Sequence, residues 1–162
     1  VPPMTRFTGQ DRAGLFHHDL RPGRREALCS LVDLAPTLLD IAGIEKPENM
    51  PGTSLLPVVR GEREEVRDCV FAEWHKPPIR GVRSRTHKYV MFLNGDEQLF
   101  DLERDPHETE NLAASASHAE IKAELKQKLQ HHIEVTRDPF YDLDRNELIF
   151  NPSAHALIGT NA

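Results

Sequence analysis

The side chains best suited to catalysis stand far apart in this chain of 162 residues. Its two cysteines, Cys29 and Cys69, each lie in an apolar run, which favours buried free thiols over a disulfide framework or a metal knuckle. His131 and His132 are adjacent, so on a helix they point in different directions and do not share a metal ion. The chain lacks the His-Glu-x-x-His, Gly-x-Ser-x-Gly and glycine-rich phosphate-loop motifs. No catalytic or metal site is therefore predicted within it.

The charged side chains indicate which classes of partner to exclude. A net charge of −6 argues against a general nucleic-acid binder, which would carry a basic face. Arg83 and Arg85 share one face of a predicted strand, and we expect them to form ion pairs with acidic partners. With 38% hydrophobic and 28% charged residues, and no apolar stretch of roughly 18 residues, the composition is that of an ordinary globular chain without a membrane span.

Three segments have the apolar spacing of helices. Residues 31–42 form the first, with Asp33 as the expected N-cap and Gly43 at its end. A short helix is expected over 54–59, capped by Ser54 and ended by Gly61. Residues 117–135 form the third, because Ile121, Leu125, Leu129 and Ile133 recur every four residues as one apolar stripe.

Between the second and third helices the pattern alternates, as it does in strands. Four strands are predicted over 69–74, 81–85, 88–93 and 98–102. The Asn94-Gly95-Asp96 run is a strong hairpin signal, because Asn and Gly accept positive φ. Short connections favour antiparallel neighbours. A helix with one apolar stripe can cover one face of such a sheet, which predicts an α+β unit with a four-stranded antiparallel sheet packed on a helix.

Four runs in this order resemble a known family. The most informative is residues 99–112, Leu-Phe-Asp-Leu-Glu-Arg-Asp-Pro-His-Glu-Thr-Glu-Asn-Leu, where a strand ends in Leu-x-Asp-Leu and Asp-Pro-x-Glu and Asn-Leu follow. The others are residues 30–44, the Pro-Gly-Thr-Ser-Leu-Leu-Pro run at 51–57, and the Arg-Thr-His-Lys-Tyr-Val run at 85–90. Together they resemble the C-terminal part of the sulfatases, which share the α/β fold of alkaline phosphatase.

This resemblance implies a division of the chain and a set of partners. Residues 1–62 would end the large α/β domain, 63–136 would form the C-terminal sheet-plus-helix subdomain, and 137–162 a tail. The chain, which begins with Val1-Pro2 rather than Met, is expected to be a fragment. Its partners would be the missing N-terminal sulfatase domain and a sulfated small molecule or glycan. Sulfatases are usually periplasmic, secreted or lysosomal.

The resemblance also implies chemistry that this chain does not carry. Sulfatases use a formylglycine made from a Cys or Ser in Cys/Ser-x-Pro-x-Arg, and a divalent cation, usually calcium. Cation and positive side chains offset the charge of the sulfate ester in the transition state. Neither Cys29 nor Cys69 lies in that motif, and the Asp-Asn-Gly and Asp-His-Gly metal motifs are absent. Calcium and formylglycine are therefore expected in the missing N-terminal part, and this chain alone is expected to be inactive.

A substrate-contacting role is implied for one stretch only. In sulfatases the C-terminal sheet borders the mouth of the active site, so His75, Lys76 and Arg80 are candidates to touch an anionic or sugar group, while Trp74 is expected in the sheet core.

Two alternatives remain open: the same region of a related phosphonate or phosphate ester hydrolase, and a stand-alone interaction domain. In the fragment we expect Leu31, Leu34, Leu38 and Ile41 to face water.

Overall fold

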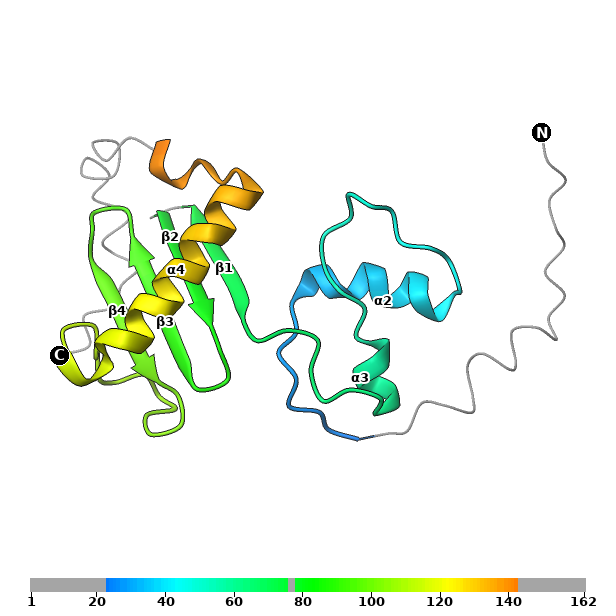
Figure 1. Cartoon of the computed structure of the whole chain (residues 1–162), viewed down its shortest axis with the longest axis horizontal. Coiled ribbons are helices and arrows are strands. Elements are labelled where there is room, and N and C mark those ends of the chain that lie inside the picture. The colour runs from blue at the N-terminus through cyan, green and yellow to red at the C-terminus, as the bar shows by residue number, and fades with distance from the viewer. Residues whose placement is uncertain (1–22, 76–77, 143–162) are drawn as a thin grey trace, which may run out of the picture. The chain divides into compact units, whose positions relative to one another are not determined.

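The computed structural model describes residues 23–75 and 78–142 of the chain. The chain divides into two compact units, Val1–Asp68 and Cys69–Ala162. Figure 1 shows helices alone among the labelled elements of the first unit, and a sheet with a long helix in the second. Each unit is described by itself below.

The first unit is built from short helices joined by ordered loops. A single 3-10 turn, η1 (Leu31–Asp33), leads into α2 (Leu34–Ile41), so the predicted helix over 31–42 is confirmed with a tighter start. Leu34 and Leu38 on α2 are 55% and 66% exposed, as expected, whereas Ile41 is half-buried. The second helix, α3 (Leu56–Arg60), ends at Gly61, whose φ of 77° is the left-handed conformation that glycine adopts without strain.

The Asp33 carboxylate connects distant parts of the first unit. Its carboxylate accepts hydrogen bonds from the Ser30 and Thr53 amides, both at 2.8 Å, and from the Arg67 guanidinium. Asp33 is the N-cap residue of α2, as predicted, but its side chain makes no cap hydrogen bond to that helix. The side chain is completely buried, and this single carboxylate joins three segments of the unit.

The loop that returns to Asp33 passes very close to η1. Gly52 has a φ of 88°, and a Cβ placed on it would stand 2.2 Å from the Val32 carbonyl oxygen. Only glycine satisfies both conditions, because it lacks the side chain that would collide. The Pro-Gly pair at 51–52 is thus explained by backbone packing.

The second unit contains the predicted four-stranded antiparallel sheet. Its strands are β1 (Val70–His75), β2 (Pro78–Arg83), β3 (His87–Phe92) and β4 (Glu97–Asp101), in the order β1-β2-β3-β4. The second strand begins three residues earlier than the alternation predicts, because proline is tolerated at the first position of a strand. The Asn94-Gly95-Asp96 hairpin is confirmed, with Gly95 at a φ of 98°.

One face of this sheet is covered by α4 (Ala119–Thr136), which follows the 3-10 turn η2 (Ala116–His118) (Figure 1). Leu125, Leu129 and Ile133 of α4 are 1–3% exposed, and Ile121 packs against the same core, which confirms the predicted stripe. The sheet supplies the facing side chains, chiefly Val82, Tyr89 and Leu99. After α4 a last turn, η3 (Pro139–Asp142), adds the buried Phe140.

Candidate functional site

The predicted substrate-contacting residues lie at and beside the connection between β1 and β2. His75 ends β1, and its backbone pairs with Pro78. Its side chain and the whole of Lys76 lie outside the described residues, so a contact between either of them and a substrate stays a prediction. Arg80 lies further along β2 and is fully described.

Arg80 is completely buried within this unit, and a contact between it and a substrate stays a prediction. Its guanidinium donates hydrogen bonds to the carbonyl oxygens of Trp74 and Ile79, both at 2.9 Å, and forms an ion pair with Asp138. It also lies over the Phe140 ring, 5.1 Å from the ring centre. These contacts favour a structural role, in which Arg80 ties the β1–β2 connection to the segment that follows α4.

Asp138 is the residue of this cluster that sequence reasoning missed. It lies 58 positions from Arg80 in the sequence and follows the end of α4. One carboxylate oxygen is 2.6 Å from the Arg80 guanidinium and also accepts the Phe140 amide at 3.0 Å. A long-range ion pair leaves no local pattern, so nothing in the sequence around 138 pointed to Arg80.

Trp74 is 63% exposed, so its predicted place in the sheet core is wrong. It lies on the sheet face opposite α4, beside a groove of about 300 Å³. The groove is lined mainly by aliphatic side chains of β1, β2 and β3, with Arg83 and Lys88 at one end: Val70, Ala72, Ile79 and Val90.

Neither arginine predicted to form ion pairs does so within the described ranges, 23–75 and 78–142. Arg83 is exposed at the end of β2, and Arg85 lies in the turn that follows it, outside the strand. Lys88, which pairs with Arg83 in the strand register, is the residue with an acidic partner: it binds Glu108. The prediction is therefore wrong for both arginines.

Glu97 is the centre of a polar cluster between β4 and α4. Lys126 donates a hydrogen bond to its carboxylate at 2.6 Å, Tyr89 at 2.7 Å and Lys122 at 3.3 Å. The hydrogen bond from Lys126 is the largest cause that lowers the pKa of Glu97 to about 2, and that from Tyr89 is the second. Each group of this cluster is paired within the unit, so the cluster stabilises the helix on the sheet and leaves no group positioned for acid–base chemistry.

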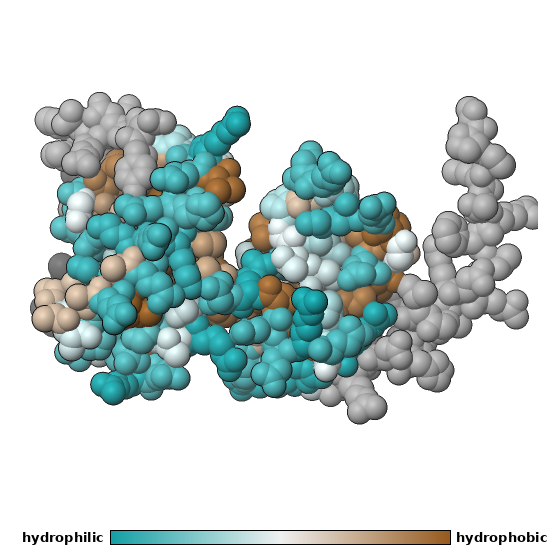
Figure 2. Space-filling view, viewed as in Figure 1, coloured by the Kyte–Doolittle hydropathy of each residue, from teal (hydrophilic) through white to brown (hydrophobic). Residues whose placement is uncertain are grey.

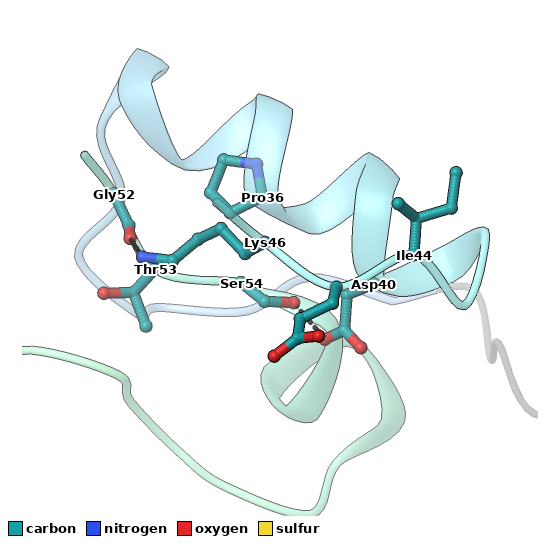
Figure 3. A pocket seen from close by; sticks show the side chains of 8 residues that line it. Pro36, Asp40, Ile44, Lys46, Gly52, Thr53 and Ser54 are labelled. Atoms are coloured by element: carbon teal, nitrogen blue, oxygen red, sulfur yellow. Dashed lines mark hydrogen bonds between the residues drawn. The ribbon is translucent and has the colours of Figure 1, made fainter. Parts of the chain in front are cut away.

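The first unit has a shallow cavity of about 320 Å³ beside α2 (Figure 3). Asp40 accepts a hydrogen bond from the Ser54 hydroxyl, and Lys46 donates to the carbonyl oxygens of Met50 and Gly52 at 3.1 and 3.0 Å. These hydrogen bonds pair the polar groups of the cavity with one another and fix the loop that follows α2. The cavity therefore presents no set of side chains that converges on a ligand.

The described residues provide neither a set of ligands for the metal ion that the resemblance implies nor its nucleophile. In the ranges that the structure describes, no three His, Cys, Asp or Glu side chains come together as a metal site. Cys69 is buried as predicted, but Cys29 is exposed, so that half of the prediction is wrong. His132 stacks on Phe71 at 3.9 Å between ring centres instead of joining His131. No helix among these residues is long and apolar enough to cross a membrane.

Comparison with known proteins agrees with these motifs and this fold. The family model for the C-terminal region of N-sulphoglucosamine sulphohydrolase matches residues 17–135. A Δ4,5-hexuronate-2-O-sulfatase from Bacteroides thetaiotaomicron is 38% identical over 120 residues, which cover 69% of this chain and 25% of that protein. A choline-sulfatase from Rhizobium meliloti is 43% identical over 117 residues, covering 68% of this chain and 23% of the relative.

A solved structure shows the same similarity in three dimensions. The structure of a 2-O GAG sulfatase superposes with a TM-score of 0.64 at 36% identity, covering 69% of this chain and 26% of that one. The chain thus spans about a quarter of the length of the relatives it matches. These matches support a sulfatase over a phosphonate or phosphate ester hydrolase and over a stand-alone domain. The chain belongs to the sulfatase family and corresponds to its C-terminal region.

Proposed function

We propose that this chain is the C-terminal region of a longer enzyme that hydrolyses sulfate esters of sulfated sugars. The observation that carries this proposal is the match of residues 17–135 to the N-sulphoglucosamine sulphohydrolase C-terminal model. Relatives named for sulfate groups on hexuronate and N-acetylglucosamine support a sugar as the substrate class.

Within that enzyme, this region completes the fold and borders the substrate pocket at the β1–β2 connection. His75 and Lys76 are the proposed contacts to the anionic or sugar part of the substrate. Arg80 is proposed to position these two residues. Its hydrogen bonds to the Trp74 carbonyl oxygen and to the Asp138 carboxylate fix the end of β1 relative to the segment that follows α4. A buried, multiply hydrogen-bonded guanidinium is a rigid support, since each lost bond would leave an unpaired group inside the unit.

Formylglycine and calcium belong, in this proposal, to the rest of the enzyme. The donor atoms of the described residues do not converge on a cation, and neither cysteine lies in the sequence from which formylglycine is made. The present region therefore supplies the wall of the pocket but neither the nucleophile nor the metal ligands.

Steady-state kinetics test the proposal. We expect the longer protein, matured to carry formylglycine, to release sulfate from a sulfated monosaccharide faster than it cleaves a phosphonate monoester, and the chain 1–162 alone to release none. His75→Ala and Lys76→Ala should raise KM several-fold. His131→Ala, an exposed histidine on α4, is the matched control and should leave KM unchanged. Preferred turnover of the phosphonate would overturn the substrate class, and unchanged KM in both variants would overturn the role of the β1–β2 connection.

A further inference from the structure

The turn between β3 and β4 contains the only Asn-Gly pair of the sequence, Asn94-Gly95. Both residues are exposed, and so is Asp96, which follows them. Gly95 has a φ of 98°, and apart from its chain neighbours no atom lies within 4 Å of the place where a Cβ would stand. The main-chain nitrogen of Gly95 is therefore open to a neighbouring group, because glycine has no side chain to shield it.

Hydrogen bonds hold the Asn94 amide group within the turn. Its Oδ1 accepts the main-chain N–H of Asp96 at 3.0 Å, and its Nδ2 donates to the Asp96 carboxylate at 2.8 Å. The first of these bonds polarises the amide carbonyl, so the Cγ atom is easier for a nucleophile to attack. The nucleophile supplied by the chain is the Gly95 nitrogen, one residue on. Its N–H donates to the Phe92 carbonyl oxygen at 3.0 Å, so this bond must open before the nitrogen attacks.

We propose that Asn94 is a modification site at which the protein deamidates spontaneously, and that opening of the β3–β4 turn sets the rate. The Gly95 nitrogen loses its proton to solvent and attacks the Asn94 Cγ atom, and the new C–N bond closes a succinimide ring. The bond from Cγ to Nδ2 then breaks, and ammonia leaves with a proton taken from water. A water molecule opens the ring at either carbonyl, which leaves aspartate or isoaspartate in place of the asparagine. The reaction consumes only water and does not depend on the proposed function.

The other asparagines in the described ranges, 23–75 and 78–142, lack this combination of features. Asn49 is exposed but is followed by Met50, whose side chain shields the main-chain nitrogen. Asn111 is followed by Leu112, and its side-chain amide makes three hydrogen bonds to main-chain groups at 3.0–3.2 Å. Both should therefore react more slowly than Asn94, and they serve as internal controls.

The two products disturb the turn to different degrees. Aspartate still suits the backbone of the turn, but it places a second carboxylate where the Asn94 amide now donates to Asp96, so attraction becomes repulsion. Isoaspartate has the larger effect, because it adds one carbon to the main chain and so changes the loop that fixes the strand register. The hydrogen bond from the Phe92 N–H to the Asp96 carbonyl oxygen, 3.0 Å long, closes this turn and reports the change.

Two contacts beside the turn carry the disturbance further into the unit. Glu97 follows the turn directly and binds Lys126 of α4, the helix whose outward side is largely hydrophilic where it faces the viewer in Figure 2. The Leu93 N–H, just before the turn, donates to the Pro78 carbonyl oxygen at 3.3 Å. In the strand register the turn lies at the same end of the sheet as the end of β1 and the start of β2. Deamidation therefore loosens this end of the sheet.

Peptide mapping of the chain 1–162, aged in warm, mildly alkaline buffer and digested in mild acid, tests the proposal. Mass spectrometry reports deamidation at each asparagine, and electron-transfer fragmentation separates isoaspartate from aspartate. In the folded chain we expect Asn94 to convert several-fold faster than Asn49 or Asn111. In the same buffer with urea it should convert several-fold faster still, because the bond from Gly95 to Phe92 is already open. An Asn94 rate in the folded chain no higher than that of the controls would overturn the proposal, as would equal Asn94 rates in the two states.

A pair of matched variants tests the structural consequence. Asn94→Asp reproduces the aspartate product, and Asn49→Asp makes the same change at the exposed asparagine of the first unit. We expect amide hydrogen exchange at Phe92 to be several-fold faster in the isoaspartate fraction of the aged chain, faster by a smaller factor in Asn94→Asp, and unchanged in Asn49→Asp. The Ser84 amide, which is bonded at 2.9 Å in the turn at the other end of the sheet, should stay equally protected in all of them. Unchanged exchange at Phe92 in the isoaspartate fraction would overturn the link between this modification and the sheet.

Discussion

The two units of this chain are held together by different means. The second unit has a core of ten buried residues, most of them apolar, gathered between α4 and the sheet. The described part of the first unit buries Leu56 and Val58 but exposes Leu31 by 85% and Leu38 by 66%. Its best-connected buried side chain is the Asp33 carboxylate. One unit is organised by a hydrophobic core and the other by a hydrogen-bonded anchor.

This difference shows which unit is equipped to be stable alone. Apolar burial is the dominant favourable contribution to folding, and a helix on a sheet is a self-sufficient arrangement. A single buried carboxylate sets local geometry but adds little net stability, because its hydrogen bonds replace bonds to water. The exposed leucines of the first unit fit the proposal that this chain is part of a longer sulfatase, whose remaining part would cover them.

The largest expected contrast comes from placing the same charge in each unit. Leu125→Asp puts an unpaired carboxylate into the core and should lower the free energy of unfolding of the second unit by about 4–5 kcal/mol. Leu38→Asp makes the same change at an exposed site and should change stability by less than about 0.5 kcal/mol. Urea denaturation followed by circular dichroism measures both. Equal shifts of the two midpoints would break the comparison.

Amide hydrogen exchange compares the units without any substitution. We expect the amides of β4 to be more protected than those of α2 by about 3 kcal/mol, since exchange from a poorly buried helix needs only local opening. The measurement is native-state exchange on the chain 1–162, restricted to a monomeric sample. Equal protection in α2 and β4 would show that the first unit is self-sufficient and would weaken the case for a covering domain.

The sequence predicted the sheet, the hairpin and the buried stripe of α4, because each is encoded locally by alternation, by Asn-Gly chemistry or by a four-residue repeat. It did not place Trp74, because both faces of β1 carry apolar residues and alternation alone does not say which face a helix covers. Arg80 and Asp138 depend on a contact across 58 positions. The Asp33 network likewise joins segments 20 and 34 positions apart, which no local pattern records.

Removing the anchor of the first unit should have an intermediate effect. Asp33→Asn keeps the shape of the side chain but removes the charge that pairs with Arg67 and one of the oxygens that accept hydrogen bonds. We expect the first unit to lose about 2–3 kcal/mol, because buried donors are left unsatisfied. Asp40→Asn, at an exposed aspartate on α2, is the control and should cost less than about 0.5 kcal/mol. Exchange rates of the α2 amides report the effect, and a similar rise in both variants would contradict the anchor role.

The smallest expected effect is a pH dependence of the second unit that comes from Glu97. Its pKa is lowered from 4.5 to about 2, chiefly by the hydrogen bond from Lys126 and then by that from Tyr89. A lowered folded-state pKa contributes stability that is complete above the unfolded value and is lost as pH falls through the folded one. The contribution should therefore fade between about pH 5 and pH 2. Because Lys126 is 39% exposed and water screens the pair, we expect only about 1 kcal/mol.

The variant Glu97→Gln separates the pH-dependent stability that Glu97 contributes from that of the other carboxylates. Hydrogen bonds from the backbone amides of Arg104 and Glu110 lower the pKa of Asp101 and Asp105, so those groups also make the unit less stable in acid. They titrate equally in wild type and variant, and the difference between the two unfolding free energies cancels them. That difference should be about 1 kcal/mol at pH 7 and should vanish near pH 2. Glu120→Gln, at an exposed glutamate on the same helix, should show no such trend. A Glu97→Gln difference that is constant from pH 7 to pH 2 would mean that the carboxylate's charge does not hold α4 on the sheet, and that the apolar stripe alone does.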